Sequence, residues 1–220
     1  MNDFTFQQTL PLKLLPSYGR HDFIVGESNI EAVNWIDNFS RSKVSGLIII
    51  GPIASGKSHL ISTLKNKYKI LQAKDINEEK ANILELKDLI IENIEKINNH
   101  NFFLHVINIV KEKNFKVLLT SRLPIKELDI KLEDLKSRLL AYSHSKILLP
   151  TDDVLRGIIL KISKDRGLIL SDNIINFIIN HLERSYSVIY NFLNELDHLS
   201  LIRKKKVTIP FIKKLIEKKF

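Results

Sequence analysis

The segment that most constrains this chain is GPIASGKS, which runs from Gly51 to Ser58. Its pattern of a glycine, four residues and Gly-Lys-Ser is typical of a phosphate-binding loop. An apolar run at 47–50 precedes it and residues 59–68 with helical spacing follow it, which is the strand, loop and helix order that such a loop needs. A chance turn between a strand and a helix is disfavoured because pattern and context agree. We therefore expect the chain to bind a purine nucleoside diphosphate or triphosphate.

Each part of the loop has its own expected role. Glycines let the backbone approach phosphates closely, and N–H groups at the start of the following helix supply positive potential. Lys57 should reach the outer phosphates, and the Ser58 hydroxyl should coordinate Mg²⁺. The expected nucleotide contacts on this segment are Gly51, Pro52, Ile53, Ala54, Ser55, Gly56, Lys57, Ser58 and His59.

The composition excludes several other classes. The chain has no cysteine, which excludes disulfides, thiolate metal sites and cysteine catalysis and is typical of a reducing compartment. Its seven histidines show no HExxH or other metal-ligand spacing. No apolar run reaches membrane-spanning length and the polar start lacks a signal-peptide pattern, so we expect a cytoplasmic protein without a membrane contact. The net charge of +9, much of it in 203–206 and 213–219, is interpreted as a solvated helix face, with a nucleic-acid or acidic-protein surface as the alternative.

Apolar spacing predicts strands that alternate with helices as far as residue 150. We expect strands at 47–50, 68–73, 88–93, 116–121 and 146–149, and helices at 28–39 (capped by Ser28), 57–67, 99–113 and 132–140. Residues 78–86 fit either a helix or a loop. This alternation predicts an α/β fold with a parallel sheet that helices cover on both faces.

After Pro150 the pattern becomes helical. Helices are expected at 152–165 (capped by Thr151), 172–182 (capped by Ser171), 187–202 and 211–219, with a short extended segment at 207–209. The predicted organisation is an extended arm at 1–22, a nucleotide-binding α/β domain at 23–150 and a small all-helical domain at 151–220.

Polar residues at the ends of two predicted strands are candidates for the metal ion and for hydrolysis. Glu92 should order Mg²⁺ and its water, with a solvated strand end as the alternative. Asn93 follows, where a catalytic carboxylate commonly polarises the attacking water. Because an amide cannot act as a base, intrinsic hydrolysis should be slow or absent. Thr120 and Ser121 either contact the γ-phosphate or the attacking water, or cap the strand end, and the sequence leaves both open.

Two further segments suggest contacts with other proteins. The block at 7–12, QQTLPL, places apolar residues in a stretch without helical periodicity. It is either a short linear motif for a partner's groove or a tail that packs on its own domain. Arg138, far from the loop in sequence, is either an ordinary surface arginine or an arginine finger for a neighbour's nucleotide site.

In this order, the segments resemble the AAA+ module of the DnaA family of replication initiators, across nearly the whole chain. The resemblance is carried by the arm, DFIVGESN at 22–29, GPIASGKS, LIIEN at 89–93, LLTSR at 118–122, LKSR at 135–138 and the helical C-terminal part. It is closest to the Hda group of short DnaA paralogues. QQTLPL resembles that group's sliding-clamp motif, KVTIPF at 206–211 resembles the end of its lid, and no room is left for a helix-turn-helix domain.

The resemblance implies a AAA+ P-loop NTPase module with a helical lid, bound ADP or ATP with Mg²⁺, and a negative regulator of replication initiation. Hda-like proteins sit on the DNA-loaded sliding clamp, the β subunit of DNA polymerase III, and trigger hydrolysis of DnaA-bound ATP. Arg138 would point into the composite site with DnaA, and DNA would be contacted indirectly through the clamp. A homodimer is left open. Adenine would be contacted by Ile24, Val25 and Gly26, and the clamp by Gln7, Leu10, Pro11 and Leu12.

Three departures from the family pattern stand out. Gln8 replaces a frequent leucine in the clamp motif, and Glu92-Asn93 replaces the usual acidic pair. Ser187 stands where the lid's sensor arginine is expected, with Arg184 one turn earlier as a candidate substitute. Two other classes stay open: an autonomous AAA+ ATPase or helicase loader, favoured by DNA-stimulated hydrolysis, and a DNA-binding protein that uses the basic tail, favoured by salt-sensitive DNA affinity independent of Lys57.

Overall fold

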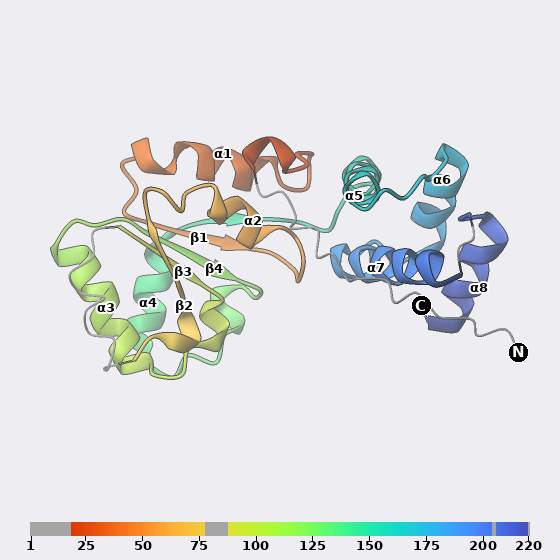
Figure 1. The fold of residues 1–220 in the computed structure, drawn as a ribbon. Coiled ribbons are helices and arrows are strands. Elements are labelled where there is room, and N and C mark those ends of the chain that lie inside the picture. The colour runs from red at the N-terminus through yellow and green to blue at the C-terminus, as the bar shows by residue number, and fades with distance from the viewer. Residues whose placement is uncertain (1–18, 78–87, 204–205, 220) are drawn as a thin grey trace, which may run out of the picture.

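The computed structural model describes residues 19–77, 88–203 and 206–219 (Figure 1). The proposed clamp motif at 7–12 and the ambiguous segment at 78–86 lie outside the described residues.

A five-stranded parallel sheet forms the centre of the first domain, with the strand order β2-β3-β4-β1-β5. The first strand of the chain pairs with β4 on one side and with β5 on the other, so it lies inside the sheet. Its residues are all buried, which explains why its sequence is continuously apolar rather than alternating. The strands are β1 (Gly46–Ile50), β2 (Lys69–Gln72), β3 (Leu89–Glu92), β4 (Val117–Ser121) and β5 (Ser143–Lys146).

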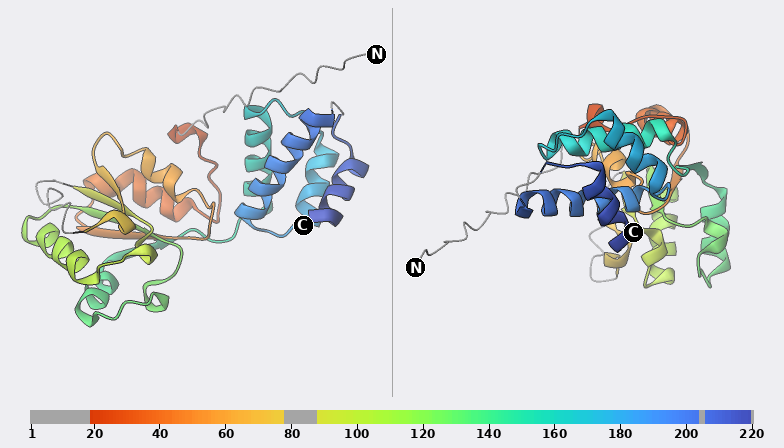
Figure 2. Two further views of the ribbon diagram at one scale, coloured as in Figure 1. Left: turned by 60° about the horizontal axis from the view of Figure 1, so that its bottom comes forward. Right: turned by 90° about the vertical axis from the view of Figure 1, so that its right-hand side faces the viewer.

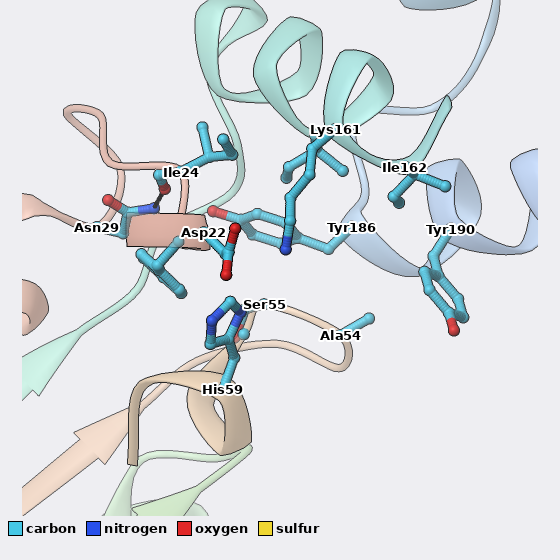
Figure 3. A pocket seen from close by; sticks show the side chains of 13 residues that line it. Asp22, Ile24, Asn29, Ala54, Ser55, His59, Lys161, Ile162, Tyr186 and Tyr190 are labelled. Atoms are coloured by element: carbon cyan, nitrogen blue, oxygen red, sulfur yellow. Dashed lines mark hydrogen bonds between the residues drawn. The ribbon is translucent and has the colours of Figure 1, made fainter. Parts of the chain in front are cut away.

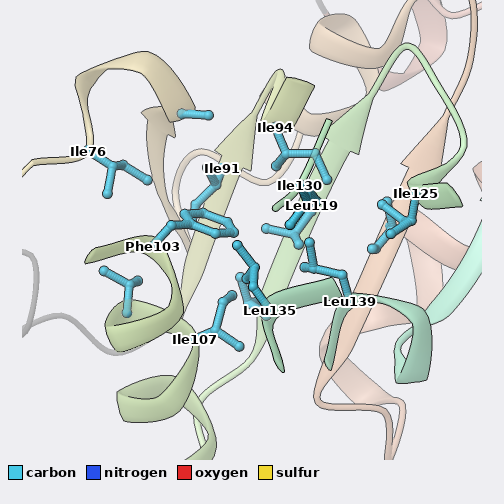
Figure 4. Packing of buried hydrophobic residues seen from close by; sticks show 14 of the residues in the cluster. Ile76, Ile91, Ile94, Phe103, Ile107, Leu119, Ile125, Ile130, Leu135 and Leu139 are labelled. Atoms are coloured by element: carbon cyan, nitrogen blue, oxygen red, sulfur yellow. The ribbon is translucent and has the colours of Figure 1, made fainter. Parts of the chain in front are cut away.

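Helices cover both faces of this sheet. Leu47 and Ile49 of β1 pack under α1 and α2, whereas Ile48 and Ile50 pack toward α3 and α4. Figure 4 shows the second face, where Phe103 lies among apolar side chains from the strands and the neighbouring helices. The elements are α1 (Ile30–Asn38), α2 (Lys57–Ser62), α3 (His100–Glu112) and α4 (Glu133–Ala141), with 3₁₀ turns η1 (Arg20–Asp22), η2 (Phe39–Arg41), η3 (Ala73–Asp75), η5 (Ile94–Lys96) and η6 (Ile125–Glu127).

Four helices form a second, smaller domain beside the sheet (Figure 2). They surround their own core, in which Phe192 is fully buried. Two of their residues, Val154 and Tyr186, belong instead to the core of the sheet domain. The Tyr186 hydroxyl also lies 3.2 Å from the Ser28 hydroxyl, so the two domains share a buried polar contact. The helices are α5 (Asp152–Asp165), α6 (Asp172–His181), α7 (Tyr186–Arg203) and α8 (Ile209–Lys219).

The predicted final strand is wrong in position. Residues 143–146 form β5, and the apolar pair Leu148 and Leu149 that suggested a strand at 146–149 is exposed. An edge strand needs only one partner, so the polar sequence SHSK can fill it.

Three helix ends also differ from expectation. Asn29 occupies the N-cap of α1 in place of Ser28, whose hydroxyl is engaged with Tyr186. The regular helix α2 ends at Ser62 rather than at residue 67. The last helix begins at Ile209, before Pro210, because proline is tolerated in the first turn, where its missing N–H costs no helical hydrogen bond.

No helix among residues 19–77, 88–203 and 206–219 is both long enough and apolar enough to cross a membrane.

The core of the helical domain gives a direct test of its packing. Phe192 is fully buried and Ile169 is 92% exposed in the same domain. We expect Phe192→Ala to lower the free energy of unfolding by about 3–5 kcal/mol because it leaves a cavity. Ile169→Ala should change it by less than about 0.5 kcal/mol. Urea unfolding followed by circular dichroism measures both, and an equal effect of the two changes would contradict the described core.

Candidate functional site

The phosphate-loop segment joins the end of β1 to the start of α2, as its pattern predicts. Ala54 and Gly56 both have positive φ, 61° and 87°. A side chain at Gly56 would also meet the ring of Phe23, at 2.6 Å from its nearest carbon. Backbone conformation and space therefore both require glycine at this position, and the loop can wrap tightly.

Lys57 lies folded into this loop. Its Nζ donates hydrogen bonds to the carbonyl oxygens of Gly51 and Pro52, at 2.6 and 2.8 Å. Burial lowers the pKa of Lys57 to about 8, and the nearby Glu95 carboxylate opposes that shift. The ammonium thus sits where oxygen acceptors are already arranged around it, and phosphate oxygens are stronger acceptors of the same kind.

The two candidate magnesium ligands meet directly. The Ser58 hydroxyl donates to Oε2 of Glu92 at 2.5 Å, across 34 positions in the sequence. Among the residues that the structure describes, no three His, Asp or Glu side chains gather as a metal site. Mg²⁺ commonly takes one or two protein oxygens and completes its shell with phosphates and water, so this pair fits a nucleotide-linked ion.

The remaining strand-end residues are engaged in hydrogen bonds with nearby groups. Thr120 Oγ1 accepts the backbone N–H of Asn93 at 3.0 Å, and the Asn93 amide donates to Gln72 Oε1 at 2.9 Å. The Ser121 hydroxyl donates to the carbonyl of Leu123 at 2.6 Å. These contacts fit the capping interpretation of Thr120 and Ser121, and a contact of either residue with the γ-phosphate or the attacking water stays a prediction.

Sequence reasoning missed a charged pair beside the loop. Arg122, directly after β4, forms an ion pair with Glu95 at 3.2 Å. Both charges act on the pKa of Lys57, Glu95 raising it and Arg122 lowering it. The available signal was a basic residue immediately after a buried strand that ends at the same sheet edge as the loop.

A cavity of about 150 Å³ lies between the phosphate loop and the helical domain (Figure 3). Its walls come from the segment before α1, from the loop and the start of α2, and from α5 and α7. Pockets that enclose a small ligand usually measure about 300–1,000 Å³. A whole nucleotide therefore needs the two domains, or side chains between them, to move apart.

The segment expected to contact adenine is only partly placed at this cavity. Ile24 lines it, whereas Val25 is 43% exposed, and Gly26 packs against Val154 of α5. Asn29 orders the turn, because its Oδ1 accepts the Gly26 N–H and its Nδ2 donates to the Ile24 carbonyl, at 3.0 and 2.9 Å. This bracing by Asn29 was not anticipated.

His59 links the same segment to α2. Its Nε2 lies 3.0 Å from the Gly19 carbonyl, and its ring packs edge-on against Phe23 at 5.4 Å. Burial is the main cause that lowers the pKa of His59. The ring lines the cavity, and its contact with a nucleotide stays a prediction.

Neither lid residue considered as a nucleotide sensor lines this cavity. The Ser187 hydroxyl lies 2.9 Å from that of Ser185. Arg184 is paired with Asp152 at 3.1 Å and its side chain is 60% exposed. The substitution of Arg184 for the missing sensor arginine is therefore not supported by its position.

Arg138 lies at the other end of the sheet from the phosphate loop, near the amino ends of the strands. It is on the last turn of α4, with Nε 3.0 Å from Oδ1 of Asp134, and its side chain is about one-third exposed. It lines a hollow with Ser45 and Tyr142, which precede β1 and β5. In a parallel sheet these amino ends lie one strand length from the carboxyl ends, about 16 Å for the five residues of β1. Arg138 is thus outside reach of its own phosphate loop.

Comparison with known proteins agrees with this geometry. Residues 152–216 match the family model described as the lid domain of Hda. A protein of Haemophilus influenzae, itself uncharacterized, is 28% identical over 228 residues, which cover 96% of this chain and 98% of that protein.

Solved structures share the fold. Domain III of the Thermotoga maritima initiator DnaA superposes with a TM-score of 0.79 at 16% identity, over 92% of this chain and 96% of that one. AMPPCP-bound DnaA from Aquifex aeolicus superposes with a TM-score of 0.68 at 22% identity, over 86% of this chain and 67% of that one. RuvB of Thermotoga maritima, a Holliday junction branch migration motor, superposes with a TM-score of 0.69 at 15% identity, over 93% of this chain and 73% of that one.

The sheet, the loop and the helical domain define a AAA+ P-loop module with a lid, which confirms the expected fold class. The chain thus resembles Hda in its lid domain, and it shares its overall fold with DnaA domain III.

The buried Lys57 predicts a pH dependence of nucleotide binding. A phosphate stabilises the charged ammonium, so binding raises the pKa of Lys57 above its value of about 8. Affinity for ADP should stay nearly constant below that pH and fall above it, by at most about tenfold per pH unit. Isothermal titration calorimetry in two buffers of different ionisation enthalpy should also detect proton uptake above pH 8. Equal affinity from about pH 7 to about pH 9 would contradict this prediction.

Proposed function

We propose that this protein is a nucleotide-bound negative regulator of replication initiation, which stimulates hydrolysis of DnaA-bound ATP while it is tethered to the sliding clamp. The observation that carries the proposal is the separation of a phosphate loop and a partly exposed arginine at opposite ends of one sheet. A phosphate loop lies at the carboxyl ends of the strands, and a partly exposed arginine lies near their amino ends. The lid of the same module matches that of Hda. In this proposed role the protein would act in the cytoplasm, where the chromosome lies.

The nucleotide of this proposal is ADP or ATP with Mg²⁺. Lys57 would bind the outer phosphates, Ser58 and Glu92 would hold the ion, and Ile24 would lie against the base. A related fold, DnaA from Aquifex aeolicus, has been solved with AMPPCP bound. In this proposal the nucleotide stabilises the contact between the sheet domain and the lid, because it would occupy the cavity between them.

Intrinsic hydrolysis is proposed to be weak. The side-chain amide of Asn93 is engaged with Gln72, and an amide cannot accept a proton from water. An autonomous ATPase or helicase loader would need another base and a lid arginine at the phosphates, and Ser187 and Arg184 do not provide the latter. DNA-stimulated turnover on the order of 1 s⁻¹ or faster in the isolated protein would favour that alternative.

The basic end of the chain is proposed to be a solvated helix face rather than a DNA-binding surface. Ile212 and Leu215 of α8 are buried, whereas Lys213 and Lys214 are exposed beside them. Lys219 is paired with Glu195 at 2.5 Å. This amphipathic arrangement explains the lysines without a nucleic acid, so we propose that DNA is reached through the clamp.

Arg138 is proposed to act in trans. Its side chain is about one-third exposed, and among the described residues it pairs with the exposed carboxylate of Asp134. An exposed i,i+4 ion pair contributes only about 0.3–0.5 kcal/mol, so a partner's phosphates can displace it. Arg138 would then stabilise charge on the transferred phosphoryl group in the site of DnaA.

The finger role predicts a selective loss. Arg138→Ala should reduce stimulation of DnaA hydrolysis by about 10³-fold or more, or to the unstimulated rate, because an arginine finger contributes that much. Nucleotide affinity of the variant itself should not change. The measurement is phosphate release by DnaA with clamp-loaded DNA. Two controls should keep stimulation: Lys136→Ala, which removes a cation from the same helix, and Asp134→Ala, which releases the arginine. Full stimulation of DnaA hydrolysis by Arg138→Ala would exclude the finger role.

The clamp contact is proposed to depend on the leucines of the motif at 7–12. Replacing Leu10 and Leu12 together by alanine should weaken capture by immobilised clamp by about tenfold or more, because anchors of this kind carry most of the energy of a short-motif contact. The matched control replaces Leu14 and Leu15, two leucines of the same arm outside the motif. Surface plasmon resonance compares the two variants, and equal capture of both would show that the motif is not the anchor.

A further inference from the structure

The cavity between the loop and the lid holds a lysine that sequence reasoning did not consider. Lys161 extends from α5 toward Asp22 and His59 in Figure 3. Its charge helps to lower the pKa of His59, after the larger effect of burial, and the charge of Asp22 acts on the same ring in the opposite direction. Both charged groups therefore lie close to His59, at the wall formed by α2.

The phosphate loop borders the same space. Ala54, Ser55 and Gly56 line the cavity with Lys161, and His59 is the residue after the loop's Ser58. The Ser55 hydroxyl is buried there without a hydrogen-bond partner. A cation from the lid thus faces the part of the site that the motif assigns to phosphates, where a lysine is a suitable point charge.

We propose that Lys161 is the lid residue that contacts the phosphate tail of the bound adenine nucleotide, and that Asp22 on the facing wall competes with the nucleotide for it. This inference rests on the proposed nucleotide binding. It assigns this contact to α5, because Ser187 at the start of α7 and Arg184 before α7 do not line the cavity and are engaged with Ser185 and Asp152.

In this proposal the Asp22 carboxylate has opposite effects with and without a bound nucleotide. With the nucleotide absent, the Asp22 carboxylate stabilises the Lys161 ammonium within the cavity. With phosphates present, the same carboxylate repels them and draws Lys161 away. Removing the Asp22 charge should therefore improve nucleotide affinity, while removing the Lys161 charge should reduce it.

A purely structural Lys161 behaves differently. If the lysine only held the lid to the sheet domain through Asp22, loss of either partner would weaken the same contact. Both changes would then alter affinity in the same direction, and adenosine would be affected as much as ADP because it occupies the same cavity without phosphates.

The test compares adenosine, AMP and ADP by isothermal titration calorimetry on the full chain. We expect Lys161→Ala to weaken ADP about tenfold or more, a loss typical of one charge-assisted contact, and to leave adenosine unchanged. Lys161→Arg should retain most of the affinity for ADP, which also shows that the site is folded. Asp22→Asn should bind ADP several-fold more tightly, as expected from removing one like charge.

The matched control is Lys164→Ala, which removes the same charge from an exposed position on the same helix and should leave all three affinities unchanged. ADP affinity unchanged in Lys161→Ala, or an equal loss for ADP and adenosine, would overturn the assignment. Equal losses in Lys161→Ala and Lys164→Ala would overturn it too, because they would show a general charge effect.

The experiment separates this inference from the proposed function. Wild-type binding of ADP that needs Lys57 but not Lys161 would overturn the assignment of Lys161 alone. Absence of ADP binding by the wild type, with Lys57→Ala no different, would overturn both the nucleotide site and the assignment.

Discussion

The position of β1 inside the parallel sheet is the constraint on which the rest of the site depends. At its carboxyl end the Gly51 N–H donates to the Ser121 carbonyl at 3.1 Å, and on the other side the Ile147 N–H donates to the Ile50 carbonyl at 2.7 Å. The chain is held on both sides at the point where it leaves the sheet. The tight loop that follows must turn there, and it carries Lys57 and Ser58 past β4 to the carboxyl end of β3, where Glu92 lies. The contact of Ser58 with Glu92 is the result.

Parallel strands also separate the two functions that we propose. All carboxyl ends meet at one edge, where the loop, Glu92 and the lid cavity lie together. All amino ends meet at the other, where Arg138 lies on the surface at the end of α4. In the proposed role, a protein built this way binds a nucleotide at one end of its strands and presents an arginine to another molecule at the other end. The arginine does not reach the phosphate loop of its own chain.

Much of the fold could be predicted because local patterns and tertiary structure agree in it. The helix expected at 152–165 has those bounds in the structure, since its apolar face, its N-cap position and the following glycine all indicate the same element. The strand expected at 146–149 was wrong because β5 is a polar edge strand, held by backbone pairing with β1 rather than by apolar side chains. Periodicity carries no information about such a strand.

The site divides in the same way. The residues of the loop, Lys57 and Ser58 above all, were predictable from a local motif, and Glu92 from its place at a strand end. Arg122 also follows a strand end and carried the same kind of signal, although its pairing with Glu95 was not expected. Asn29 and Lys161 could not be found by these rules, because their roles depend on which segments the fold brings together. Lys161 occurs in a helix of ordinary amphipathic sequence, and only the approach of α5 to the loop gives it a place at the cavity.

The central claim is that the phosphate loop around Lys57 holds an adenine nucleotide. It is tested most directly by identifying the nucleotide that the purified protein carries. Denaturing the protein and analysing the released small molecules by chromatography and mass spectrometry gives both identity and stoichiometry. The account predicts ADP or ATP from the wild type, restored by incubation with Mg²⁺ and nucleotide where purification has removed it, and none retained by Lys57→Ala. A wild-type protein that neither carries nor takes up an adenine nucleotide, or a Lys57→Ala variant that retains as much as the wild type, would contradict it.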